Sequence, residues 1–141
     1  ASLREQPVYA QLPLAVRAYT YFEGPSEAEP NNSFAQANGP IRFSRDYSGR
    51  SLADGADPAY TKDFFSIRVT SPGTAAVELD TPSPDGQLQL FDSAFVRLDS
   101  VTVPPFRLSR SLQPGLYYVY VTTAINPNPN QQPYRLRVNF Q

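Results

Sequence analysis

From residue 62 onward, apolar and polar residues alternate in short runs that are typical of half-buried β-strands. The run at 134–140 is the clearest, because Tyr134, Leu136, Val138 and Phe140 share one side and polar residues occupy the other. No stretch shows the 3.6-residue periodicity of a helix. We therefore predict a strand there and similar strands at residues 63–69, 74–80, 87–90 and 116–121.

Turn-forming residues separate these runs. Proline, glycine and asparagine concentrate at residues 71–73, 81–86, 113–115 and 126–130. Short strands spaced by about ten residues, with such turns between them, indicate two packed antiparallel sheets. The sequence therefore predicts an all-β fold, an antiparallel β-sandwich.

The beginning of the chain has a different pattern. Residues 8–22 are rich in apolar side chains, but Pro7 and Pro13 interrupt them, which favours an edge strand or a docked arm over a central strand. We therefore divide the chain into an N-terminal arm or edge-strand extension, residues 1–22, and a sandwich domain, residues 23–141.

The segment between the arm and the first clear strand is mostly polar. Residues 23–40 are rich in glutamate, proline, asparagine and glycine and are expected to form a loop. Residues 41–43 are a candidate short strand, and residues 48–62 a polar connection.

Composition excludes several classes of function. The chain has 141 residues and contains no His, Cys, Met or Trp, which excludes histidine- or cysteine-based catalysis and the usual zinc sites. A net charge of -1, with cations and anions interspersed, gives no basic surface for nucleic acid, and no apolar stretch is long enough for a transmembrane segment. Asp92 with Asp99, or Asp54 with Asp57, would be a carboxylate pair, but neither pair lies among substrate-holding residues. We expect no enzyme activity.

One segment offers metal-binding chemistry. Glu27, Glu29, Asn31 and Asn32 place two carboxylates and two amide oxygens within six residues. Calcium prefers six to eight such oxygen ligands, and Asp57 or Asp63 would add to the shell. The alternative is a solvated turn in which Asn31 or Asn32 caps a short helical turn over Phe34.

A second candidate surface lies in the run at 116–121. If Tyr117, Val119 and Val121 point inward, Tyr118 and Tyr120 stand on the opposite face. Two neighbouring tyrosines would hold a peptide or stack on a sugar. The other interpretation is that the N-terminal segment covers this face.

Four motifs resemble one known family. Glu-x-Glu-Pro-Asn-Asn-Ser-x-x-x-Ala-Asn, Glu27 to Asn38, is similar to the opening of the bacterial pre-peptidase C-terminal domain. Residues 62–67, 114–119 and 134–138 resemble later strands of that family in the same order. The likeness covers about residues 27–140 and leaves residues 1–22 outside it.

The resemblance implies a jelly-roll-like β-sandwich, appended to secreted proteases and other exported proteins and not itself catalytic. Related collagen-binding domains of clostridial collagenases bind calcium through a similar acidic segment. Glu27, Glu29, Asn31 and Asp63 match ligand positions there. Asn32 stands where an aspartate is expected, which removes one charge, and the spacing of Asp57 departs from the pattern.

The expected function is a non-catalytic, exported accessory or interaction module of a bacterial cell-surface or secreted assembly, stabilised by Ca²⁺ and bound to a protein partner. The alternative is a ligand-binding module for a fibrous protein or a polysaccharide that uses Tyr118 and Tyr120. Either function places the chain outside the cell or in the cell envelope. A chain that begins at Ala1 is what signal-peptide removal or trimming would leave.

Overall fold

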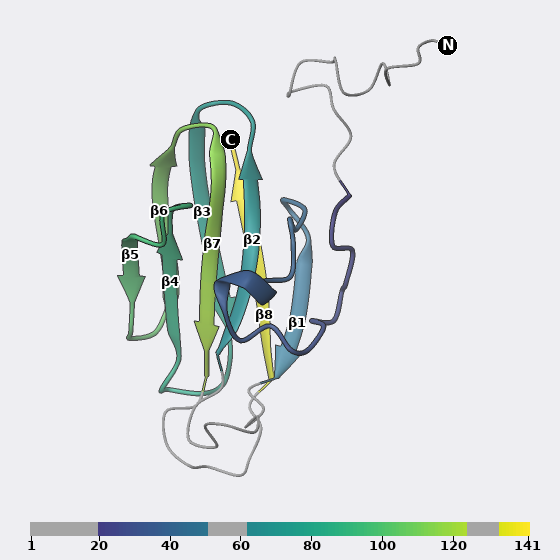
Figure 1. Ribbon diagram of the computed structural model, residues 1–141. Helices are drawn as coiled ribbons and strands as arrows, with labels where there is room; N and C mark the ends of the chain where they lie inside the picture. The colour runs from purple at the N-terminus through teal and green to yellow at the C-terminus, as the bar shows by residue number, and fades with distance from the viewer. Residues whose placement is uncertain (1–19, 51–61, 124–132) are drawn as a thin grey trace, which may run out of the picture.

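A computed structural model describes residues 20–50, 62–123 and 133–141, and these residues form eight strands (Figure 1). Helical structure in the described residues is one 3₁₀ turn, Phe34–Gln36, so none of them forms a helix that could cross a membrane. The strands are β1 Asp46–Arg50, β2 Asp63–Val69, β3 Gly73–Asp80, β4 Gln87–Phe91, β5 Arg97–Val101, β6 Phe106–Leu112, β7 Gly115–Thr122 and β8 Pro133–Phe140.

The strands form two four-stranded sheets. One has the order β1-β8-β3-β6 and the other β2-β7-β4-β5, and all pairs of neighbouring strands are antiparallel. Successive strands change sheet except at the β4–β5 hairpin, which is the connectivity of a jelly roll. The predicted all-β, antiparallel jelly-roll-like sandwich is confirmed.

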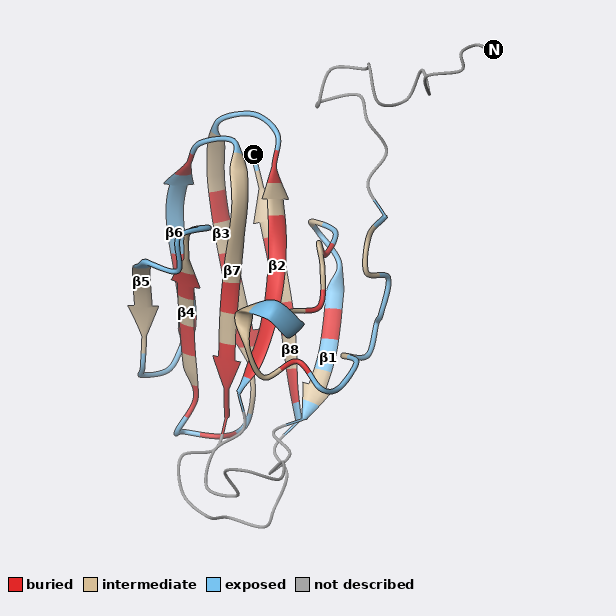
Figure 2. Ribbon diagram, in the orientation of Figure 1, coloured by how far each residue is buried: buried red, intermediate tan, exposed pale blue. Residues whose placement is uncertain are grey.

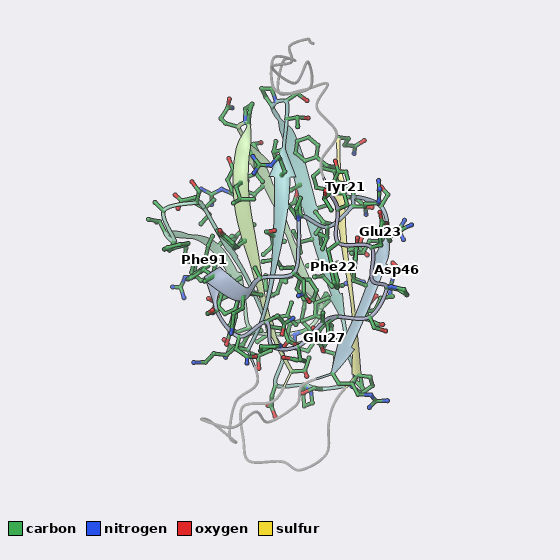
Figure 3. All side chains as sticks on the ribbon, turned by 45° about the vertical axis from the view of Figure 1, so that its right-hand side comes forward. Tyr21, Phe22, Glu23, Glu27, Asp46 and Phe91 are labelled. Carbon is green, nitrogen blue, oxygen red and sulfur yellow. The ribbon has the colours of Figure 1, made fainter. Side chains whose placement is uncertain are left out.

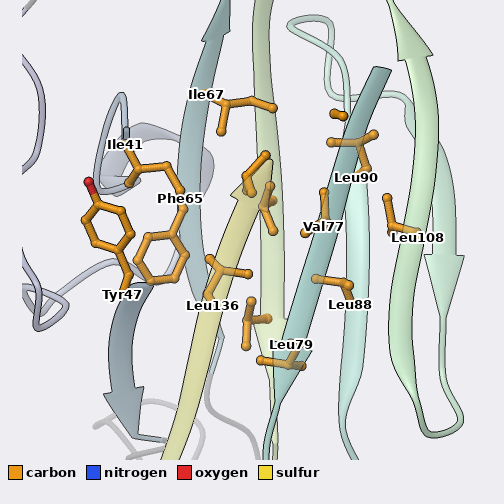
Figure 4. Close-up of a cluster of buried hydrophobic side chains, with 14 of the residues drawn as sticks. Ile41, Tyr47, Phe65, Ile67, Val77, Leu79, Leu88, Leu90, Leu108 and Leu136 are labelled. Carbon is orange, nitrogen blue, oxygen red and sulfur yellow. The ribbon is translucent and has the colours of Figure 1, made fainter. Parts of the chain in front are cut away.

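The core lies between the sheets and consists of the inward side of each alternating run (Figures 2 and 4). In β8, Tyr134, Leu136 and Val138 are buried, whereas the two arginines between them are half-buried on the outer side. The fully buried side chains are Ile41, Tyr47, Phe65, Ile67, Val69, Val77, Leu79, Leu88, Leu90, Val119, Val121 and Leu136, among others.

Two expectations for the first third were wrong. Residues 41–43 do not form a strand, because Ile41 makes only an isolated bridge to Phe22 and the chain then turns at Phe43 and Ser44. Residues 48–50 are not a loop but the end of β1. Strand β1 buries one side chain, Tyr47, so it has no alternating pattern to recognise.

The free edges of β1 and β2 are covered by residues 22–41. Ser26 bridges Ser48 of β1, and the Glu27 N–H donates to the Ser48 carbonyl at 2.8 Å. Along β2, the Phe64 N–H donates to the Asn31 carbonyl at 2.8 Å, and further backbone bonds follow to Ile41. One segment therefore satisfies edge groups of both sheets on the same side of the molecule.

Tyr47 fixes the start of this segment. Its hydroxyl donates to the Phe22 carbonyl at 2.6 Å and accepts the Arg42 N–H at 2.9 Å, while its ring is fully buried. Figure 3 shows Phe22 and Glu27 on the side of the sandwich that carries β1. The predicted arm, by contrast, lies almost entirely outside the described residues, and its boundary at residue 22 stays a prediction.

Tyr47→Phe should lower the free energy of unfolding by about 1–3 kcal/mol, because it leaves the Phe22 carbonyl and the Arg42 N–H without their partner. Urea denaturation measures this loss. The matched control is Tyr117→Phe, whose hydroxyl donates to the Gln113 carbonyl in an exposed position, and it should cost less than about 1 kcal/mol. Equal losses in the two variants would contradict this role of Tyr47.

Candidate metal centre

Three carboxylates meet where β1 ends and β2 begins. Glu27 and Glu29 come from the segment that covers β1, and Asp63 is the first residue of β2. One oxygen from each lies within 4.8 Å of the others. Glu27 is held by the backbone bond to Ser48 and Asp63 by its pairing with Val121 of β7, so backbone hydrogen bonds set the cluster.

Two asparagines fix the loop that carries the glutamates. Asn31 is completely buried, and its amide donates to Glu27 Oε1 and to Asn38 Oδ1, both at 3.1 Å. Asn38 Oδ1 also accepts the Ala28 N–H at 2.9 Å, and Asn38 Nδ2 donates to the Ala28 carbonyl at 3.0 Å. The Asn38 side chain therefore bonds to both backbone groups of Ala28, as a residue on an adjacent strand would. Asn31 connects Asn38 to the Glu27 carboxylate.

Residues of β1 and β8 close the inner side of the cluster. The Tyr134 hydroxyl donates to Asp63 Oδ2 at 2.7 Å, and the Arg50 N–H donates to Glu27 Oε2 at 2.7 Å. A Cβ at Gly49 would overlap both the Glu27 carboxylate and the Tyr134 hydroxyl. Glycine is thus required here by close approach.

Two oxygens at the cluster have no hydrogen-bond partner among the described residues. They are Asn31 Oδ1 and Asp63 Oδ1, and both side chains are at most 1% exposed. Buried polar atoms normally have partners, since an unsatisfied one costs free energy. Orphaned oxygens beside three carboxylates fit a hard cation, because calcium takes carboxylate and amide oxygens. The residues that would hold it are Glu27, Glu29 and Asp63. Asn31 lies beside them, but its amide nitrogen is the atom that contacts Glu27, so its Oδ1 would become a ligand only if the amide turned over.

The cluster also perturbs proton binding. Burial, followed by the negative charge of Glu27, raises the pKa of Asp63 to about 10, against the opposing hydrogen bond from Tyr134. Glu29 is exposed as a residue, but partial burial of its carboxyl group and the adjacent Glu27 raise its pKa to about 7. Burial and the nearby Asp63 raise the pKa of Tyr134. These shifts express first the cost of burying a charged group and then the repulsion between neighbouring negative charges.

The structure thus brings together Glu27, Glu29 and Asp63, with Asn31 beside them. Asn32 also has a buried Oδ1, but within the described residues it forms no hydrogen bond to the carboxylates. Asp57 lies outside the described residues. Sequence reasoning did not identify Tyr134 or Gly49 as parts of the site, because both lie in strands and carry no local signal. Asn38 is the last residue of the motif at Glu27 to Asn38 that resembles the known family. Its place in that motif was the single feature of the sequence that pointed to it.

Tyr118 and Tyr120 lie on the outer face of the second sheet, where an aromatic cluster half-buries them. The Phe34 ring crosses this face from the 3₁₀ turn, with its centroid 5.2 Å from Tyr118 and 4.7 Å from Phe64. Tyr120 in turn packs on Phe64 at 5.2 Å. Within the described residues, Phe34 and the aromatic rings around it therefore cover the two tyrosines on this face.

Comparison with known proteins gives matches in structure and none in sequence. No protein-family model matches the sequence, and no curated protein sequence does. The pre-peptidase C-terminal domain of the collagenase from Bacillus anthracis is similar, with a TM-score of 0.53, 17% identity and coverage of 69% of this chain and 90% of that one. The chain has the fold of a pre-peptidase C-terminal domain. The resemblance carried by the four motifs is thereby confirmed at the level of the fold.

A second solved structure shares the fold. PliG from Aeromonas hydrophila, a periplasmic inhibitor of g-type lysozyme, has a TM-score of 0.55 and 12% identity, and the match covers 72% of this chain and 93% of that one. At such identities the likeness concerns the fold alone. The same sandwich thus serves as a collagenase domain in one protein and as an inhibitor in another.

In the absence of divalent cations, stability should fall as pH rises from 5 to about 9. Glu29 and Asp63 keep their protons in the folded chain at pH values where the unfolded chain has lost them, because the unfolded carboxyl groups ionise near pH 4. The contribution of these two groups to the free energy of unfolding is therefore fully present below pH 4. It is lost as pH rises through about 7 for Glu29 and about 10 for Asp63. Urea denaturation in chelator at several pH values measures the effect.

Asp63→Asn is the control for this pH dependence, because the amide is similar in shape and cannot ionise. Its stability should be nearly constant above pH 7. The exposed Glu23 and Asp46 have lowered pKa values, through hydrogen bonds from Arg42 and Arg137 respectively, and therefore titrate below this window. Wild-type stability that rises between pH 5 and 9 would refute the assignment.

Proposed function

We propose that this chain is a calcium-stabilised, non-catalytic binding module that acts outside the cytoplasm, in a secreted or cell-envelope assembly. The observation that carries the proposal is the carboxylate cluster of Glu27, Glu29 and Asp63 with the unpartnered oxygens of Asn31 and Asp63. Within the described residues, no arginine or lysine forms an ion pair with these carboxylates. A divalent cation would supply the missing positive charge.

Calcium at this position would act as a cross-link. Glu27 and Glu29 lie on the segment that covers β1, whereas Asp63 begins β2 in the other sheet. An ion bound to all three would tie the two sheets together and join the segment to them. It would bind the folded chain far better than the unfolded one and therefore stabilise the fold by mass action. Extracellular calcium-binding modules have dissociation constants of about 0.1–1 mM.

The proposal of a binding module rests on the fold and the composition. Two of the solved structures that share the fold are a domain of a collagenase and an inhibitor of lysozyme, and the second is described as periplasmic. The sequence has no His or Cys with which to build the usual nucleophilic or zinc-dependent sites. A protein partner fits these features better than a substrate does.

Calcium should raise the thermal midpoint of the chelator-treated protein, and chelator should lower it again. At about one hundred times the dissociation constant, the ion adds about 2.7 kcal/mol of stability. Scanning calorimetry with a calcium titration measures the response, and magnesium serves as the comparison ion. Calorimetric titration at pH 6 and 8 should also show proton release on binding, because the carboxyl groups must ionise.

Glu29→Gln and Asp63→Asn should each reduce the calcium response, since each removes a charged ligand. The matched control is Glu78→Gln, a half-buried carboxylate on the outer side of β3, which should leave the response unchanged. An unchanged thermal midpoint in chelator and in calcium, for the wild-type chain, would overturn the calcium part of the proposal.

The second candidate function is retention on a fibrous protein or a polysaccharide through Tyr118 and Tyr120. Its support is that Phe95, beside Tyr118 at 5.8 Å, is 53% exposed and extends the aromatic face into solvent. Replacing both tyrosines with Leu keeps the apolar packing and removes the aromatic rings on which a ligand would stack. Retention on collagen, cellulose or xylan columns should then fall severalfold, while the thermal midpoint changes little. Unchanged retention, or none by the wild-type chain, rules this function out.

A further inference from the structure

Strand β5 is an outer edge of the sandwich, on the side opposite β1 (Figure 1). It pairs with β4 on one side only, and its five residues run from Arg97 to Val101. The edges of β1 and β2 are covered by backbone from residues 22–41, whereas no described segment pairs with the outer edge of β5. An uncovered strand edge is a place where another chain can add a strand.

The exposed large apolar side chains of the described residues gather at the ends of β5. They are Phe95 and Val96 before it, 53% and 55% exposed, and Val103 after it, 67% exposed. Figure 2 shows the segments on either side of this strand as exposed and the strand itself as mostly intermediate. A contiguous exposed apolar patch marks an interaction site, whereas single exposed residues do not. Here Phe95 and Val96 are adjacent before the strand, and Val103 lies beyond its other end.

The turn that presents Phe95 is held firmly. Phe95 has a φ of 65°, a left-handed conformation that is uncommon for a bulky residue. Asp92 imposes it, because Asp92 Oδ1 accepts the N–H groups of Ala94 at 2.8 Å and Val96 at 3.0 Å, and backbone bonds join Asp92 to Phe95 and Val96. The ring also stacks on Phe34 at 4.3 Å. The apolar end of β5 is therefore preorganised.

Two charged side chains form hydrogen bonds with backbone groups of β5. Arg110, from β6, donates to the Leu98 carbonyl, and the Ser100 N–H donates to Asp99 Oδ1 at 2.8 Å. Arg110 is exposed, and a partner strand that brings a carboxylate would draw the guanidinium away from Leu98. The Leu98 carbonyl would then be free to accept a hydrogen bond from the added strand.

The charges at this edge select the partner. Arg97 is exposed and forms no ion pair within the described part of the chain, and Arg110 bonds only to a carbonyl among those residues. A second copy of the chain satisfies these charges less well. Antiparallel self-pairing centred on Asp99 would place two Asp99 carboxylates opposite each other, and self-pairing centred on Leu98 would use Asp99, the single carboxylate of β5, on Arg97 and leave none of this strand for Arg110. An acidic segment would instead neutralise both arginines.

We propose that the β5 edge binds an extended acidic segment of a partner protein by strand addition. The apolar side chains of that segment pack on Phe95, Val96 and Val103, and its carboxylates pair with Arg97 and Arg110. This inference rests on the proposed binding function and specifies the class of partner. It places the docking edge away from the calcium cluster, which lies beside β1 and β2.

The probe is a fluorescein-labelled peptide of about eight residues in which glutamate alternates with valine, a length that matches β5 and its flanks. Fluorescence anisotropy should show saturable binding to the calcium-loaded protein. In amide NMR spectra, the Ser100 and Leu98 resonances should shift. The same peptide with lysine in place of glutamate, and one with N-methylated backbone amides, should each bind at least about tenfold more weakly.

Arg97→Gln with Arg110→Gln should weaken binding of the acidic peptide about tenfold or more. Arg107→Gln is the matched control, because this arginine also lies on β6 but pairs with Asp80 of β3, the adjacent strand of its own sheet, and it should change binding less than about twofold. Phe95→Ser should also weaken binding, and calorimetry checks that each variant is folded.

Three results would overturn the proposal. They are no binding of the acidic peptide at about 1 mM, equal binding of the lysine or N-methylated peptide, or dimer formation by the chain that the peptide does not affect. The calcium response of the thermal midpoint does not involve β5. Loss of peptide binding with that response intact therefore counts against the docking edge alone.

Discussion

A β-sandwich must satisfy the backbone groups along the open edges of its sheets, and this requirement shapes the molecule. On one side it is met by residues 22–41, which bind first β1 and then β2. Because that segment must run along both edges, Glu27 and Glu29 are carried to Asp63 at the start of β2. The carboxylate cluster is a result of edge covering. On the far side, no described segment pairs with the outer edge of β5, and side chains bond to two of its backbone groups instead.

The strands predicted from the sequence are β2, β3, β4, β7 and β8, whereas β5 and β6 were not predicted, although β6 buries Phe106, Leu108 and Leu112 on one side. In β8 and β3, alternate residues enter the core, so the pattern of apolar positions specifies both the strand and its orientation. Strand β2 alternates in its apolar residues but is buried on both faces. Strand β1 was not predicted, because Tyr47 is its single buried residue and no alternating pattern results. Backbone pairing with β8 sets the position of this strand. Backbone hydrogen bonds do not depend on side-chain type, which is also why the course of residues 22–41 was not predictable.

The candidate site was predictable to the extent that its ligands are local. Glu27, Glu29 and Asn31 form a compact acidic motif, and the family resemblance added Asp63. Tyr134 was assigned to the core from its place in an alternating run, and it is indeed buried there. Its hydroxyl group nevertheless reaches Asp63, a contact that needs the two sheets to be stacked before it exists. The alternation of apolar and polar residues shows which face of the sheet a residue lies on, but it does not show which residues of the other sheet its side chain contacts.

The fixed loop around Asn38 has a consequence for how an ion would enter. Backbone bonds to β1 and β2, the amide pairing with Ala28 and the Phe34 ring hold the glutamate segment in place at several points. The ligand groups therefore need no folding transition to assemble. Binding to such a preformed site buries little additional apolar surface, so the heat-capacity change on binding is small. The chain would work as a rigid receptor for the ion, with a rate set by dehydration of the ion.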